Sequence, residues 1–311
     1  MFRTVVIEKE KELRVSNGIL HVTDENEDVP IPLKDIYCIV LDNLMSVCSV
    51  ASLVELTAEG AHLVLCDRRH MPTAVLYPEV IHYRPYHVVK MQLETSIGLR
   101  NALWDSIVKS KLINQAEVLS FCTGNNDVSE RIRELAEEVE EGDGGNREGI
   151  GAKMFFRNMY GSEFVRMKDD GINSALNYGY AILRSCIVKT LYTFGYYPPI
   201  GIHHIGVGNP FNLGDDLIEP FRPLVDAWVS IHNDDLLTEL TGEQRLSLIS
   251  LVNMNIEYEG KNMKLRNVIN LYIKSFTTAL QEKIYQNLLR PCLIKSCMIR
   301  YVTLYESNSN V

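Results

Sequence analysis

The stretch YPEVIHYRPY, residues 77–86, divides the sequence into two parts with different hydrophobic patterns. Its two prolines and three tyrosines break both the spacing of strands and the spacing of helices, which predicts a linker. Short β-branched runs precede this stretch, and long helical patterns follow it. We therefore expect an α+β chain with a small N-terminal β-rich domain over 1–78, a linker over 79–88, a larger all-helical domain over 89–289 and a tail over 290–311.

Upstream of the linker, the patterns are those of hairpins with one packed helix. The strand-like runs RTVVIE, ELRVS, GILHVT, DVPIPL and DIYCIVL are separated by charged and turn-forming residues, among which Asn17-Gly18 is the strongest turn signal. Helical apolar spacing runs from Val47 to Glu59 and ends at Gly60, and the following HLVLCD predicts a buried strand. Together these runs predict one sheet covered by one helix.

Downstream of the linker, apolar residues recur at i, i+3 and i+4 almost to the end of the chain. This spacing predicts helices over 87–120, 127–141, 171–195, 243–253 and 262–289, and two more that begin near Asn146 and Asp216. The stretch NIEYEGKNMKL also fits a hairpin that turns at Glu259-Gly260.

The composition is typical of a soluble globular protein. The 311 residues are 46% hydrophobic and 23% charged, and no apolar run reaches the roughly 18 to 20 residues that cross a bilayer. The first residues lack the pattern of a signal peptide, and the seven cysteines are scattered through apolar stretches, as expected of reduced thiols. We therefore expect a cytoplasmic protein that does not associate with membranes.

The charge is uneven along the chain. A formal net charge of -9 excludes a protein that coats nucleic acid through its overall field, although local contacts stay possible. Much of the acidic excess lies in ERIRELAEEVEEGDGG, residues 130–145, whereas residues 146–190 carry seven Arg and Lys against four Asp and Glu. The sign of the charge therefore reverses at residue 146.

The first candidate site lies in NREGIGAKMFFRNMYG, residues 146–161. If Asn146 caps a helix, Glu148 lies in the first turn, where the helix dipole favours an ionised carboxylate. The positions 4, 7, 8 and 11 residues after Glu148 are apolar, so that Glu148 faces inward; they are Ala152, Phe155, Phe156 and Met159. Glu148 is therefore either a ligand in a site or an acid that serves only the helix end.

The second candidate site is the loop GIHHIGVGNPFNLGDD, residues 201–216. His203 and His204 are adjacent, so in an extended loop they point in opposite directions and only one faces a given site. One neutral imidazole among carboxylates suits Mn²⁺ or Mg²⁺. The alternative is a histidine with a structural hydrogen bond.

The third candidate site is DDLIEPFRPLVDAW, residues 215–228. Asp216 and Glu219 are three residues apart and would share one face at the start of a helix, where the two prolines also fit. The alternative is a capping box with Asp216 as N-cap and Glu219 at N3. Arg222 either clamps a phosphate or pairs with an acid.

The order NREG, GIHH, NPFNL and DLIEPFRPLVD resembles the CRISPR-associated adaptation integrase family, the core nuclease of spacer acquisition, and most closely its type II branch. The resemblance extends from FRTVV through CDRRHMPTAVLYP to about residue 289, and the tail after it matches no known pattern. It implies a helical catalytic domain after the β-rich one, a homodimer, and a small ferredoxin-like partner that bridges two dimers. A type II effector nuclease and a DNA-end-binding accessory protein are further implied partners.

The resemblance also implies the residues of the catalytic site. In this family a Glu, a His and an acidic residue hold the divalent ion, and the matching positions are Glu148, His204 and Glu219, with His203 as the alternative histidine. Asp216 matches an acid that assists at the site in some relatives. Position 219 is Glu where some branches have Asp, which keeps the ligand type but lengthens the side chain.

The implied activity is that of a DNA endonuclease and integrase that depends on Mg²⁺ or Mn²⁺. The 3′-hydroxyl of a double-stranded DNA fragment attacks a phosphodiester of the CRISPR repeat DNA, which needs no nucleotide cofactor. Contacts to DNA phosphates are expected from Arg84, Lys90, Arg147, Lys153, Arg157, Arg166, Lys168 and Arg222. The alternatives are a non-catalytic DNA-binding scaffold subunit of the acquisition complex, and a metal-dependent nuclease that cuts without joining.

Overall fold

The computed structural model describes residues 3–79, 82, 84–258 and 260–292. The chain forms two compact units, of which the first comprises Met1–Ile81 and Glu239–Ser250, and the second His82–Thr238 and Leu251–Val311. The chain therefore leaves the second unit once and returns to it. The sequence patterns predict a division near the linker but not this second crossing.

The first unit contains two four-stranded sheets, so the expected single sheet is wrong. In one sheet the order is β1-β5-β7-β8, with β7 and β8 antiparallel and the other pairs parallel; in the other it is β4-β3-β2-β6. The strands are β1 (Arg3–Ile7), β2 (Glu12–Ser16), β3 (Ile19–Thr23), β4 (Asp28–Pro32), β5 (Ile36–Leu41), β6 (Val47–Cys48), β7 (His62–Cys66) and β8 (Pro72–Leu76). Two sheets form because β5 pairs with β1 and not with its sequence neighbour β4.

Local sequence explains the turn and the helix of this unit. Asn17 and Gly18 have φ of 52° and 74°, as a tight two-residue hairpin turn between β2 and β3 requires. The helix α1 (Val50–Ala58) begins after Ser49, whose hydroxyl accepts the hydrogen bond of the Ser52 backbone N–H. The first residues of the predicted helix form β6 instead, because the cap lies at Ser49.

The helix α9 (Gly242–Ser250) belongs to the first unit through a buried ion pair. Arg245 Nε lies 2.6 Å from Asp42 Oδ2, and a second guanidinium nitrogen of Arg245 lies 3.4 Å from Glu8 Oε1. The Asp42 side chain is fully buried, and its other oxygen lies 2.8 Å from His70 Nδ1. Arg245 therefore supplies the charge that allows a carboxylate in the interior of this unit.

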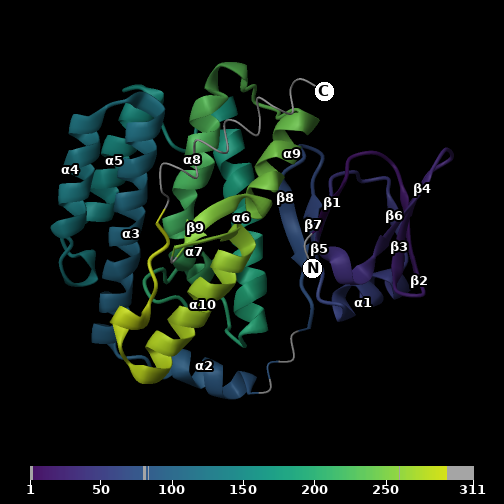
Figure 1. The fold of residues 1–311 in the computed structure, drawn as a ribbon, viewed down its shortest axis with the longest axis horizontal. Coiled ribbons are helices and arrows are strands. Elements are labelled where there is room, and N and C mark those ends of the chain that lie inside the picture. The colour runs from purple at the N-terminus through teal and green to yellow at the C-terminus, as the bar shows by residue number, and fades with distance from the viewer. Residues whose placement is uncertain (1–2, 80–81, 83, 259, 293–311) are drawn as a thin grey trace. The chain divides into compact units, whose positions relative to one another are not determined.

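The second unit is mostly helical, which confirms the predicted fold class (Figure 1). Its helices are α2 (Pro85–Glu94), α3 (Ile97–Thr123), α4 (Asn126–Glu137), α5 (Arg147–Tyr160), α6 (Gly171–Thr193), α7 (Asn212–Ile218), α8 (Arg222–Ile231) and α10 (Leu265–Glu282), with the short 3-10 helices η2 (Glu141–Asp143), η3 (Glu219–Phe221), η4 (Asn233–Asp235), η5 (Leu251–Asn253) and η6 (Tyr285–Asn287). The unit is not all-helical as predicted, since β9 (Asn255–Tyr258) and β10 (Lys261–Lys264) form the hairpin that the sequence allows. A further 3-10 helix, η1 (Leu33–Asp35), lies in the first unit.

The long helix α3 is the centre of the second unit. Its buried residues lie on all sides of the helix, and it packs against α4, α5, α8 and η3. The predicted helix over 87–120 is divided into α2 and α3 because Ser96 caps α3 through its side chain. Ser110 and Asn114 of α3 also donate hydrogen bonds to the carbonyl of Pro291, so the described start of the tail packs on this helix. The remaining tail residues, 293–311, lie outside the described residues.

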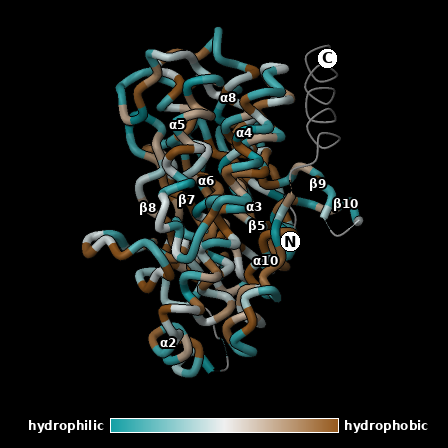
Figure 2. The backbone as a smooth tube through the Cα atoms, turned by 90° about the vertical axis from the view of Figure 1, so that its left-hand side faces the viewer, coloured by the Kyte–Doolittle hydropathy of each residue, from teal (hydrophilic) through white to brown (hydrophobic). Residues whose placement is uncertain are grey.

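Hydrophobic and hydrophilic residues alternate along the helices, as Figure 2 shows. In the part of the chain that the structure describes, no helix combines the length and the apolar character that a membrane crossing demands. The apolar residues of α10 instead fall on its buried side, among them Val268, Tyr272 and Phe276.

We expect Arg245→Met to destabilise the protein by about 3–5 kcal/mol, because it leaves Asp42 buried without its cation. Arg14→Met is the matched control, since Arg14 pairs with Glu12 at the surface and its loss should cost at most about 1 kcal/mol. Urea denaturation followed by fluorescence compares the two variants. Equal effects of the two substitutions would contradict this assignment.

Candidate metal centre

Glu148 is fixed by the loop that precedes α5. The two carboxylate oxygens of Asp143 accept hydrogen bonds from the backbone N–H groups of Arg147 (2.7 Å) and Glu148 (3.0 Å). Asn146 accepts one from Gly149 N–H (3.3 Å), which confirms that it caps this helix. Four orphan N–H groups begin every helix, and Asp143 and Asn146 satisfy three of them here. Asp143 is a residue that the sequence patterns did not indicate.

The helix α5 can approach α3 closely because it carries a glycine at the contact. A Cβ atom on Gly151 would lie 2.2 Å from Leu112 of α3. This close approach brings Glu148, one turn before Gly151, against the side of α3. Phe155 and Met159 are buried on the same side of α5, as the apolar spacing predicts.

The histidine loop is held by Asp216. The carboxylate of Asp216 accepts hydrogen bonds from the backbone N–H groups of Ile202 (2.7 Å), His203 (3.2 Å) and His204 (3.0 Å). His204 Nδ1 donates to the same carboxylate at 2.7 Å. A Cβ atom on Gly201 would lie 2.3 Å from the His204 carbonyl oxygen and 2.8 Å from Asp216, so the tight loop requires glycine there.

Asp216 is therefore not a helix N-cap, and the structure rules out the capping box with Glu219 that the sequence left open as an alternative. The helix α7 begins at Asn212, which places Asp216 inside it, where its side chain is fully buried. The predicted helix start near Asp216 is wrong for the same reason. The carboxylate of Asp216 binds both the loop backbone and the ring of His204, so Asp216 positions His204.

Glu219 lies where α7 passes into η3, and its side chain is 6% exposed. Its two oxygens each contact a cation: Oε1 lies 3.1 Å from Arg222 Nε and Oε2 lies 2.5 Å from Lys111 Nζ. Burial raises the pKa of Glu219, but Arg222 and Lys111 outweigh it, so that the pKa falls below its usual value. The acid therefore stays ionised although it is buried.

Lys111 is the residue of this centre that the sequence analysis missed. Its ammonium group contacts the carboxylates of both Glu148 and Glu219, and its side chain is 7% exposed. Burial lowers the pKa of Lys111, but the two carboxylates reverse this effect and the pKa is raised. The available signal was a lysine next to Leu112 and four residues after Ile107 in a helical apolar pattern, because a lysine is almost never fully buried unless it is paired.

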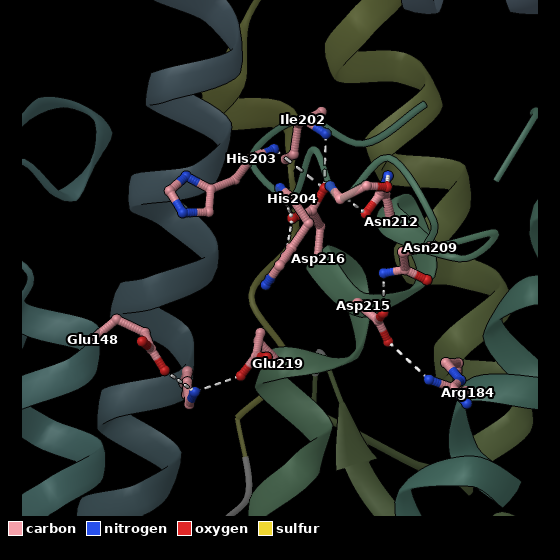
Figure 3. A network of polar contacts seen from close by, with 12 residues as sticks. Glu148, Arg184, Ile202, His203, His204, Asn209, Asn212, Asp215, Asp216 and Glu219 are labelled. Carbon is pink, nitrogen blue, oxygen red and sulfur yellow. Dashed lines mark hydrogen bonds and ion pairs between the residues drawn. The ribbon is translucent and has the colours of Figure 1, made fainter. Parts of the chain in front are cut away.

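The two histidines of the loop have different surroundings. His204 extends from the loop toward Glu219, as Figure 3 shows. Its hydrogen bond to Asp216 raises the pKa of His204. His203 instead stacks on Trp104 of α3, with ring centroids 4.0 Å apart, and burial lowers its pKa. Of the two histidines left open by the sequence, His204 is the one directed toward the acid pair.

Figure 3 also shows the carboxylates of Glu148 and Glu219 converging from two helical segments. Among the described residues, no three His, Cys, Asp or Glu side chains lie close enough together to enclose a metal ion. The cation between the two acids is the Lys111 ammonium. The chemistry of the side chains still fits Mg²⁺ or Mn²⁺. Two carboxylates converge on a positive charge, and an imidazole is directed toward one of them, which are ligand types that these ions accept.

The basic residues expected at a DNA surface fall into two groups. Three of them are half-buried and bind other residues of the protein: Arg222 pairs with Glu219, Arg147 with Glu138 at 3.2 Å, and Arg166 donates to Asn173 and Asn177. The others are exposed, namely Arg84, Lys90, Lys153, Arg157 and Lys168, and of these Lys90 pairs with Glu94 at 3.7 Å. Between the two roles left open for Arg222, the structure shows the pairing with an acid.

Comparisons with known proteins identify relatives over most of the chain. A family model described as CRISPR associated protein Cas1 matches residues 4–159 and 162–255. A CRISPR-associated endonuclease Cas1 of Neisseria meningitidis serogroup C (strain 8013) is 35% identical over 285 residues, which cover 91% of this chain and 93% of that protein.

Two solved structures share the fold at low sequence identity. A casposase bound to integration product is 17% identical, with a TM-score of 0.75 over 90% of this chain and 91% of that one. A chain of a Cas6-RT-Cas1–Cas2 complex is also 17% identical, with a TM-score of 0.73 over 94% of this chain and 36% of that one.

We expect Asp216→Asn to release the histidine loop, because an amide replaces the carboxylate that accepts three backbone hydrogen bonds. The backbone amides of residues 202–204 should exchange with solvent about tenfold faster or more, and the pKa of His204 should fall toward its ordinary value. Hydrogen exchange and an NMR titration measure the two effects.

The matched control is Asp215→Asn, since the neighbouring Asp215 contacts Arg184 and the side chain of Asn209 and accepts no hydrogen bond from the backbone of residues 202–204. It should leave the exchange of residues 202–204 unchanged, and it should lower the pKa of His204 less than Asp216→Asn does, because Asp216 is the larger cause of the raised pKa. If Asp216→Asn also left the exchange unchanged, the loop would be held by contacts other than this carboxylate.

Proposed function

This chain belongs to the Cas1 family of CRISPR-associated proteins, and from that premise we propose that it is a metal-dependent DNA endonuclease and integrase of spacer acquisition. It would insert short DNA fragments into the CRISPR repeat array by attack of a fragment 3′-hydroxyl on a phosphodiester. The observation that carries the proposal is the convergence of Glu148 and Glu219 on one cation beside His204. Glu219 is buried and Glu148 is partly exposed, and a buried carboxylate beside a second acid is costly unless a cation compensates for the lost hydration.

Glu148, His204 and Glu219 are the proposed ligands of Mg²⁺ or Mn²⁺. A bound divalent ion would act as a Lewis acid toward the phosphodiester. The protein prepares the ligands for this role: Lys111 and Arg222 keep Glu219 ionised, and Asp143 and Asn146 fix the helix end that carries Glu148. Asp216 orients His204 through Nδ1, which leaves Nε2 as the nitrogen directed away from that hydrogen bond.

The proposed substrates are a double-stranded DNA fragment and CRISPR repeat DNA. The casposase in the matched structure is bound to an integration product, which supports a fold compatible with strand joining. Lys153, Arg157 and Lys168 are exposed on the same unit as Glu148 and are proposed to contact phosphates. Such contacts position the nucleic acid without reading its sequence.

The proposed assembly is a homodimer that associates with a small ferredoxin-like partner. The Cas6-RT-Cas1–Cas2 complex supports this proposal, since one of its chains shares the fold over 94% of this chain. A type II effector nuclease and a DNA-end-binding accessory protein are proposed as further partners on the basis of the type II resemblance.

The main alternative is a non-catalytic scaffold that only binds DNA. In a scaffold, the acids would serve only to cap helices. Asp216, however, is not an N-cap, and Glu219 is buried between two cations. These contacts favour a catalytic centre. A nuclease that cuts without joining is separated from an integrase by the formation of joined product.

We expect Glu148→Ala to abolish strand joining, because it removes one of the two carboxylates of the centre. The assay combines the protein, its small partner, a short duplex with free 3′-hydroxyls and a supercoiled plasmid that contains repeats, with Mg²⁺, Mn²⁺ or EDTA. Glu163→Ala is the control, since Glu163 is an exposed acid beyond the end of α5. Joining by the Glu148 variant at the wild-type rate would falsify the site, and binding without joining or cleavage by the wild type would favour the scaffold.

We expect the double variant Lys153→Ala/Arg157→Ala to bind duplex DNA with a weaker salt dependence. Losing two phosphate contacts should reduce the slope of log K against log salt by about 1.8. Fluorescence anisotropy at several salt concentrations measures the slope, and Lys34→Ala, on an exposed position of the first unit, is the control. A slope equal to that of the wild type would exclude these two residues from the interface.

A further inference from the structure

Lys111 occupies a position that the proposed mechanism does not explain. It lies in the middle of α3, and its ammonium group contacts the carboxylates of Glu148 and Glu219 at once. These are the two acids proposed to hold the divalent ion. A protein cation therefore lies where a metal cation would also be attracted.

The two acids depend on Lys111 to different degrees. Glu219 has a second cation, because Arg222 Nε lies 3.1 Å from its Oε1. For Glu148, Lys111 is the ion-pair partner recorded in the described part of the chain. Without Lys111, the partly exposed Glu148 carboxylate would face the buried Glu219 carboxylate, whose remaining nearby cation in the described chain is Arg222, with His204 when it is protonated. Like charges at short range repel strongly where water is largely excluded.

We propose that Lys111 is a positioning residue that holds Glu148 and Glu219 together in the metal-free protein and lowers the affinity of the centre for the divalent ion. This inference rests on the proposed metal centre. The ammonium group contacts both acids and so keeps the two proposed ligands converged. The ammonium group also repels an incoming cation, and this repulsion lowers the affinity of the centre for the divalent ion.

The chemistry of lysine suits this role. Its ammonium is a compact charge on a flexible four-carbon stem, so it can change its partners without movement of the helix. The stem is enclosed by the core around α3, where Leu112 and Asn114 are fully buried. Methionine has a stem of similar length without the charge, so Lys111→Met removes the cation and keeps most of the packing.

The test uses full-length Lys111→Met and the wild type, both freed of metal, with MnCl₂ as the probe. We expect calorimetric titration to show at least about tenfold tighter binding of Mn²⁺ by the variant. In EDTA the variant should melt at a lower temperature than the wild type, and Mn²⁺ should raise its melting temperature more than that of the wild type. A purely structural lysine would also lower the melting temperature, but its loss would not tighten metal binding.

Lys109→Met is the matched control on the same helix, because Lys109 has no recorded contact with Glu148 or Glu219 in the described chain. It should leave the Mn²⁺ affinity unchanged.

The double variant Lys111→Met/Glu148→Gln removes one charge of each sign, so it should regain the melting temperature of the wild type in EDTA and lose the tighter Mn²⁺ binding. If Lys111→Met does not fold without metal while the double variant does, the repulsion between the acids is established and the inference is supported.

Three outcomes overturn the inference. Unchanged or weaker Mn²⁺ binding by Lys111→Met, with wild-type binding that Glu148→Ala abolishes, rejects the role of Lys111 and leaves the metal centre standing. Failure of the double variant to fold shows that Lys111 serves packing. Absence of Mn²⁺ binding in both the wild type and Lys111→Met rejects the proposed metal centre itself, and the inference with it.

Discussion

The arrangement of the second unit depends on how it keeps buried acids charged. A carboxylate taken out of water is costly unless cations and hydrogen bonds compensate for the lost hydration. The centre meets this requirement with Lys111 and Arg222 for Glu219, and with Lys111 for Glu148. Because Lys111 lies on the central helix α3, the acids of α5 and η3 are both directed toward that helix. The contact of α5 and η3 with α3 therefore brings both acids to Lys111, so the same packing that joins the three segments also balances the charge of the centre.

A second layer of contacts fixes the geometry before any ligand binds. Asp216 accepts hydrogen bonds from three consecutive backbone N–H groups and from His204 Nδ1, which leaves the loop little freedom. Asn114 of α3 donates to the carbonyl of Pro220 at 2.7 Å, which ties η3, and Glu219 within it, to α3. Catalytic groups held by their neighbours need no reorganisation during the reaction, and this preorganisation is a major source of catalytic power.

Much of this fold follows from local sequence, and the departures have identifiable causes. The Asn17-Gly18 turn, the cap at Asn146 and the hairpin at Gly260 were predictable because each depends on residues within one turn. The pairing of β5 with β1, and the membership of α9 in the first unit through Arg245 and Asp42, depend on contacts between distant residues. Spacing along the chain carries no information about such contacts.

The candidate centre shows the same division. Glu148 could be found because its helix has a readable cap and an apolar face. The role of Asp216 stayed open between a site acid and a helix cap, because three residues of separation from Glu219 are equally typical of a capping box and of two acids on neighbouring helical segments. The partners of Lys111 could not be predicted, since they meet it only where α3, α5 and η3 come together.

The acidic run before α5 shows how a chain of net charge -9 can still carry exposed cations that lack a close acidic partner. Three acids of this run form ion pairs with arginines of the same run: Arg131 contacts Glu134 and Glu138, and Arg133 contacts Glu130 as well as Glu117 of α3. Lys153, Arg157 and Lys168, by contrast, are exposed and have no ion pair among the described residues. Charges that are paired at close range contribute little field beyond a Debye length of about 8 Å, whereas single exposed cations retain theirs. Near Lys153 and Arg157 of α5, these exposed cations therefore contribute more to the local field than the total charge of the chain suggests.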